Sequence, residues 1–135
     1  MIISRSTKNG FTIIELLVAI TIAAVLAAIV ISDINPARRF AESRNSKRQS
    51  DVASVSNAIA QYRVEHTGAI PPGITTAPQA PVSISTISAV LVPTYLSVIP
   101  TDPQGGQYTA SYDANYRVVV SAPAAELTVN ISVTQ

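Results

Sequence analysis

The chain has 135 residues, enough for one anchored helix and a single modest domain but too few for two independent domains. Hydrophobic residues make up 47% and charged residues 13%, the formal net charge is +1, and there is no cysteine. This composition excludes a disulfide framework, and the overall charge gives no electrostatic argument for binding nucleic acid.

The stretch from Phe11 to Ile31 contains one ionisable side chain, Glu15, and no glycine or proline. A helix of this length spans about 30 Å, the thickness of a bilayer core, and a core helix this long is seldom apolar on every face. The segment is therefore predicted to be a transmembrane helix. A carboxylate in hydrocarbon costs about 2.5 kcal/mol or more, so Glu15 either reaches headgroup water or pairs with a positive charge, such as a new α-amino group at Phe11.

Residues 1–10 are short, basic and polar, and end in Lys8-Asn9-Gly10, which is followed by Phe11-Thr12-Ile13-Ile14-Glu15 and the apolar run. This register resembles the N-terminal signature of type IV pilins and type II secretion pseudopilins. The resemblance implies that a prepilin peptidase removes residues 1–10 by cutting after Gly10 and N-methylates Phe11. It also implies that Glu15 pairs with the terminal amine of a neighbouring subunit during filament assembly.

Two features in and around the apolar run leave open the cleavage site and the membrane orientation. Small residues within the apolar stretch could mimic an ordinary secretory cleavage site, but the run is longer than an ordinary signal core. Arg5 and Lys8 favour a cytoplasmic N-terminus, whereas the basic residues at 38–48 favour the opposite orientation. The resemblance implies the cytoplasmic N-terminus.

Beyond the membrane and assembly helix, assigned to residues 11–35, the spine is predicted to continue as an amphipathic helix over 36–67, kinked or restarted at Pro36. Residues 42–51 contain nothing apolar, which predicts a solvated surface or polar contacts with neighbours. Apolar residues then recur three and four apart, so packing against the head is expected to start near Val52; the stripe comprises Val52, Val55, Ile59 and Tyr62. Gly68 is predicted to end the helix.

The remaining residues, 68–135, are predicted to form a surface loop and the sheet of a globular head. The stretch Ile84–Leu91 fits a short helix or a strand. Two runs, 108–112 and 116–121, flank a turn and predict a hairpin, and alternation over 127–133 predicts a third, half-buried strand. The expected fold class is α+β: a long N-terminal helix packed on a small antiparallel sheet of about three strands, as in type IV pilins.

Residues suited to catalysis or metal binding are scarce. His66 is the only histidine, and it is assigned a surface or helix-capping role because no cysteine or acidic cluster completes a reactive site. Asp102 and Asp113 could approach each other across a turn, but only Glu126 adds a carboxylate beyond them, so calcium is not expected. No catalytic residue, metal ligand or cofactor is predicted.

The basic group Arg38 to Arg48 has two interpretations. Interleaved with Ser, Asn, Gln and Glu, it fits a solvated collar at the headgroups or filament contacts. DNA capture is the other interpretation, although Phe40 alone is a poor stacking platform for single strands.

The sequence therefore predicts a structural protein rather than an enzyme: a subunit of a type IV pilus-like filament, stored as a single-pass membrane precursor and later exposed at the cell surface. The resemblance implies four partners, namely prepilin peptidase, identical or homologous pilin subunits, an inner-membrane assembly platform with its ATPase, and membrane lipid. One alternative is a pseudopilin of a type II secretion or competence (DNA uptake) system. The other is a singly membrane-anchored binding protein.

Overall fold

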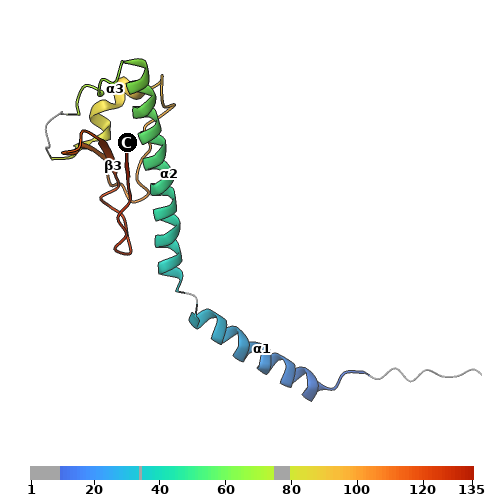
Figure 1. Ribbon diagram of the computed structural model, residues 1–135. Helices are drawn as coiled ribbons and strands as arrows, with labels where there is room; N and C mark the ends of the chain where they lie inside the picture. Colours follow the sequence, from blue (N-terminus) through green and yellow to red (C-terminus); the bar gives the residue numbers. More distant parts are fainter. Residues whose placement is uncertain (1–9, 34, 75–79) are drawn as a thin grey trace, which may run out of the picture. The chain divides into compact units, whose positions relative to one another are not determined.

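The structure, a computed structural model, describes residues 10–33, 35–74 and 80–135. The chain divides after Pro36 into two compact units. The described part of the first unit contains one helix, α1 (Ile13–Asp33) (Figure 1). Its segment from Ile13 to Ile31 has a mean hydropathy of 2.8, none of it is buried, and it is long and apolar enough to cross a membrane.

The second unit begins with α2 (Pro36–Glu65). Proline suits a first helical position, because its missing N–H would have no partner there and its φ is already helical. The spine is thus restarted at Pro36 and consists of two helices. At the other end, Thr67 and Gly68 have φ of 54° and 89°, and the Gly68 N–H donates to the Arg63 carbonyl at 2.7 Å. This closing turn confirms the predicted end of the helix, with Thr67 taking the left-handed conformation that glycine usually takes.

The head contains an antiparallel sheet in the order β1-β2-β3-β4. Its strands are β1 (Val82–Ser83), β2 (Thr109–Tyr112), β3 (Val118–Ser121) and β4 (Ser132–Thr134). The expected α+β fold is confirmed, and the expected hairpin is β2–β3. Four strands replace the predicted three because Val82 and Ser83 pair with β2; two residues are too few to show an alternating pattern. The stretch left open as helix or strand is helical, a 3₁₀ turn at Ile84–Ile87 followed by α3 (Ser88–Leu91).

The core lies between α2 and the sheet, which lie side by side in Figure 1. Val52, Val55 and Ile59 are fully buried, as the apolar stripe predicts. They join alternate residues of β3 and the two short helices, namely Val118, Val120, Ile84, Ile87 and Leu91. The same face of α2 is also buried further back, at Ala41, Asn45 and Arg48.

Two predictions were therefore wrong. Packing against the head starts at Ala41 instead of near Val52. For residues 42–51 the sequence left open a solvated surface or polar contacts, and Arg44, Asn45 and Arg48 make polar contacts. The strand expected over 127–133 is formed only from Ser132 onward. Leu127 and Thr128 have φ of 59° and 54°, a left-handed conformation that is incompatible with a strand.

Substituting Val55 with aspartate tests the core. Val55→Asp buries a carboxylate without a counter-charge and should lower the free energy of unfolding by roughly 3 kcal/mol or more. Asn57→Asp, on the exposed side of the same helix, should change it by about 0.5 kcal/mol or less. Thermal unfolding of the detergent-solubilised chain, followed by circular dichroism, measures both; equal shifts would contradict the assigned packing.

Candidate functional site

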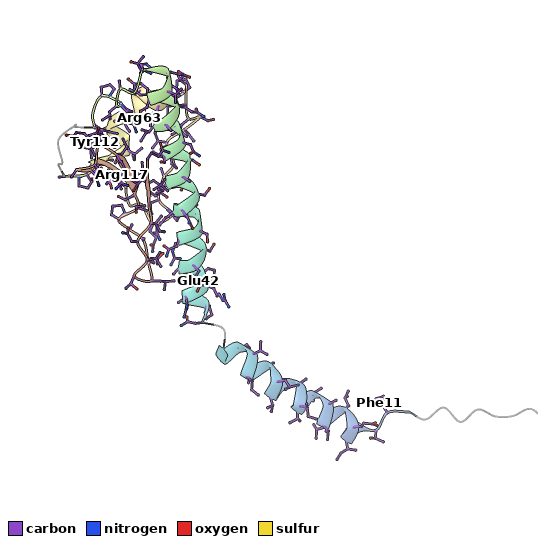
Figure 2. The ribbon with its side chains drawn as sticks, in the orientation of Figure 1. Phe11, Glu42, Arg63, Tyr112 and Arg117 are labelled. Carbon is purple, nitrogen blue, oxygen red and sulfur yellow. The ribbon has the colours of Figure 1, made fainter. Side chains whose placement is uncertain are left out.

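The first candidate site is the start of the apolar helix, where sequence analysis placed Gly10, Phe11 and Glu15. Gly10 is exposed, and a Cβ built on it would meet no atom within 4 Å. Phe11 is 81% exposed and lies just before α1 (Figure 2). The peptide bond between the two residues is therefore accessible in the described structure.

Thr12 caps α1 and fixes the position of Glu15. The Thr12 Oγ1 accepts a hydrogen bond from the Glu15 N–H at 3.3 Å, and the Thr12 carbonyl accepts from the Leu16 N–H at 3.2 Å. This arrangement satisfies a backbone donor that the first turn would otherwise leave free. Sequence analysis missed the cap, although a threonine three residues before a glutamate is its known signature.

Glu15 lies in the first turn of α1, where the positive end of the helix dipole favours a carboxylate. Among the described residues its side chain forms no ion pair. Every described neighbour along α1 up to Ile31 is exposed. Between Ile13 and Ile31 the helix therefore presents a single carboxylate, in its first turn, on a surface that is otherwise almost entirely apolar.

A second cluster, in the head, surrounds the buried guanidinium of Arg48. Arg48 is fully buried and its Nε lies 2.6 Å from Asp102 Oδ2, whose side chain is only 2% exposed. Its Nη2 donates to Asp102 Oδ1 at 3.1 Å and to Gln104 at 2.8 Å, and its Nη1 donates to Asn45 and Glu126, both at 2.9 Å. A buried charge is tolerated only when it is paired and fully hydrogen-bonded, as it is here.

Glu126 brings a second segment to the same face of α2. Arg44 donates to both its carboxylate oxygens at 2.7 Å, a bidentate pair. Asn45 donates to the Glu126 carbonyl at 2.8 Å and accepts from the Glu126 N–H at 3.0 Å. The backbone of Glu126 is therefore docked on α2 by both of its polar groups.

These contacts shift the ionisation of the cluster in a consistent direction. Hydrogen bonds from Arg44 and Arg48 lower the pKa of Glu126 to about 2, and those from Arg48 lower the pKa of Asp102. The same carboxylates raise the pKa of Arg48 above its ordinary value. The cluster is thus fully charged at neutral pH. Each charged group is paired with an oppositely charged neighbour, so the cluster stabilises the fold.

The other candidate residues lie apart from these sites. Asp113 pairs with Arg117 at 2.8 Å within the hairpin turn, so it and Asp102 have different partners. His66 is exposed and stacks on Tyr62, with ring centroids 3.9 Å apart, and its Nδ1 lies 2.9 Å from the Tyr62 carbonyl oxygen. In the described ranges no three His, Cys, Asp or Glu side chains come together as a metal site would require.

The basic group expected to form a solvated collar is divided between two environments. Arg38 and Arg39 are exposed and pair with Glu42, which is labelled in Figure 2. Arg48 is buried instead, which corrects the expectation for that residue. The burial of Arg48 was predictable from residue spacing. The three-and-four repeat of the apolar stripe continues backward from Val52 through Arg48, Asn45 and Ala41.

Comparison with known proteins shows sequence similarity to one family and to one secretion protein. Residues 5–31 match the family described as the prokaryotic N-terminal methylation motif. Over 103 residues the chain is 27% identical to the type II secretion system core protein G of Escherichia coli (strain K12), a match that covers 75% of this chain and 70% of that protein. No solved structure matches the chain significantly.

The pH dependence of stability should report the Glu126 contacts. Because folding lowers the pKa of Glu126 from 4.5 to about 2, its stabilising effect is complete above pH 4.5 and is lost as the pH falls to about 2. Glu126→Gln should therefore be less stable than the natural chain near neutral pH, and the difference should shrink as the pH falls from 4.5 through about 2. Urea unfolding across this range measures it.

Glu42→Gln is the matched control, since Glu42 pairs with two arginines that are 68% and 73% exposed. Solvent screens such pairs, so this variant should differ little from the natural chain at any pH. An effect as large as that of Glu126→Gln would show that the docked position of Glu126 is not what stabilises the head.

Proposed function

Because the chain belongs to the type IV pilin and type II secretion pseudopilin family, we propose that it is a pseudopilin: a precursor held in the membrane by α1, cut after Gly10, and polymerised through its N-terminal helix in a type II secretion-like system. Its partners are then prepilin peptidase, identical or homologous subunits, and an inner-membrane assembly platform with its ATPase. The role is structural, and no reaction on a substrate is part of it.

The exposed apolar surface of α1 carries this proposal. From Ile13 to Ile31 the helix has no buried residue, and large apolar side chains such as Leu16, Ile22 and Val30 are more than half exposed. Such a surface is unfavourable in water by about 25 cal/mol per Å², so it needs lipid or other apolar helices around it. Storage in a bilayer followed by bundling with other subunits supplies the two environments in turn.

Glu15 gives the bundled state its specificity. Cutting before Phe11 creates an α-amino group at the end of the helix, a positive charge that has no partner in lipid. A neighbouring subunit displaced along the bundle can place its Glu15 carboxylate beside that amine, and the pair then neutralises both charges where little water is present. Thr12 supports this role, since its hydroxyl caps the Glu15 N–H, and among the described residues the Glu15 carboxylate forms no ion pair.

The similarity to core protein G supports one of the two filament types that the sequence suggested. A long surface pilus, the first expectation, would use the same cleavage and the same helix. The matched stretch is 103 residues long, against 27 for the methylation motif over 5–31, so it extends well beyond the segment that all such subunits share. This extent favours a secretion pseudopilus. The cytoplasmic N-terminus, with the head on the opposite side of the membrane, is the orientation that the resemblance to pilins implies.

Processing should depend on Gly10. Its replacement by phenylalanine puts a bulky side chain at the cut and should leave the full precursor in the membrane, whereas the natural chain should yield a mature subunit that starts at N-methylated Phe11. Mass spectrometry of the intact subunit from cells that carry prepilin peptidase distinguishes the two forms. A mature chain that begins at Met1, or beyond residue 24, would contradict the proposal.

Assembly should depend on the charge of Glu15. Glu15→Ala should still insert, because it removes a polar group from hydrocarbon, and should still be cut. The yield of assembled multimers, measured by chemical cross-linking in the membrane fraction, should fall about tenfold or more, because each incoming amine lacks a counter-charge. Thr21→Ala, on the same helix, keeps the carboxylate and should assemble normally. Normal yield from Glu15→Ala, with processed subunit present, would remove the pairing role.

A further inference from the structure

Two charged side chains of the head have no oppositely charged partner. In the described parts of the head, 37–74 and 80–135, every lysine, arginine, aspartate and glutamate forms an ion pair except Arg63 and Glu65. Both lie in the last turn of α2, where Figure 2 labels Arg63. The head therefore leaves one cation and one anion unneutralised, two residues apart in the sequence.

Arg63 lines a groove of about 450 Å³ at the end of α2, together with Val64 and Gln135. Among the buried side-chain nitrogen and oxygen atoms that the structure describes, only Arg63 Nε has no hydrogen-bond partner. An unsatisfied donor costs free energy, and a guanidinium pairs with a carboxylate through two parallel hydrogen bonds. The negative end of the α2 dipole lies at the same turn. The groove therefore suits a single carboxylate better than a more highly charged anion such as phosphate.

Glu65 is exposed, and the head holds its carboxylate in place without neutralising it. Glu65 Oε2 accepts a hydrogen bond from the Tyr95 hydroxyl at 2.6 Å. The Tyr95 ring is itself packed edge-on against Tyr62, with ring centroids 5.7 Å apart. A carboxylate can accept several hydrogen bonds, so this contact leaves Glu65 able to accept from a further donor. Glu65 is thus a positioned anion on the surface of the head.

The two unpaired residues lie on opposite sides of α2. Residues two apart on a helix are separated by about 200° around its axis, so Arg63 and Glu65 do not face each other and cannot pair within one chain. Heads that lie side by side in the same orientation would present Glu65 of one copy to Arg63 of the next. Such a contact leaves Arg63 free at one end of the row and Glu65 free at the other. Contacts of this heterologous type propagate without closing, as a filament requires.

We propose that Arg63 of one head binds Glu65 of the neighbouring head in the assembled filament. The inference rests on the proposed function, which places copies of this chain beside one another in one orientation. An exposed ion pair is weak alone, but the bundled N-terminal helices raise the effective concentration of the heads. Arg63 is also half-buried, which limits the screening of its charge by salt. The pair therefore determines which sides of two heads meet.

Charge reversal tests the pair in cells that carry prepilin peptidase and the assembly platform. Arg63→Glu alone and Glu65→Arg alone each place like charges opposite one another, so each should lower the yield of multimers cross-linked in the membrane fraction several-fold, while cleavage stays normal. Expressing the two variants together should restore the yield, because alternating copies then face opposite charges. This restoration also excludes a folding defect in either variant. Gln61→Glu, on the exposed side of the same helix, adds negative charge near the pair and should leave the yield unchanged.

Cross-linking provides a second measurement, because the natural chain contains no cysteine. Cells express Arg63→Cys and Glu65→Cys subunits together, and the membrane fraction is treated with a short bismaleimide. Covalent dimers that join one subunit of each kind are expected. Neither variant expressed alone should give dimers, since the proposed contact brings unlike positions together.

Several outcomes would overturn this contact and leave the proposed function intact. They are normal multimer yields from both single charge reversals, dimers between two Arg63→Cys subunits, and an equal loss of yield from Gln61→Glu. A yield that falls for Arg63→Glu and is not restored by Glu65→Arg subunits would assign the groove to a carboxylate of another protein and also overturn the contact. Failure of the natural chain to be cut and cross-linked into multimers would overturn the proposed function and this contact together.

Discussion

The architecture of the head depends on the buried guanidinium of Arg48. It sits fully buried on α2 and holds Asp102 from one loop and Glu126 from another. Three segments far apart in sequence therefore meet at one cation. Removing a single partner would leave a buried charge without compensation, which is far more costly than losing an exposed ion pair. The positions of the 102–106 loop and the 122–131 segment follow from this requirement.

The two units of the chain meet opposite physical demands. The head has a closed core in which the apolar residues of α2, the sheet and the short helices cover one another. Helix α1 has no such cover, so its free energy depends on what surrounds it rather than on its own fold. This division would suit the proposed filament subunit, in which α1 would exchange lipid for neighbouring helices while the core of the head stays intact.

The strongly periodic parts of the fold were predictable from the sequence. The apolar helix, the stripe from Val52 to Ile59, the helix end at Gly68 and the β2–β3 hairpin each rest on a local pattern whose spacing determines the buried face. The strand expected over 127–133 did not form in full because a long-range contact overrode the local alternation. Glu126 is fastened to α2 by Arg44 and Asn45, and the chain turns there instead of extending.

The sequence by itself was enough to identify the candidate site, namely the glycine, phenylalanine and glutamate at the start of an apolar run. These features are local and need no partner in the head. It also contained the threonine that caps the helix, as part of a local motif. Only the tertiary structure decided that Arg48 is buried among carboxylates while Arg38 and Arg39 stay exposed. Composition alone does not distinguish these arginines. Their exposure differs because Asp102 and Glu126, more than 50 residues further along the chain, fold back onto one face of α2.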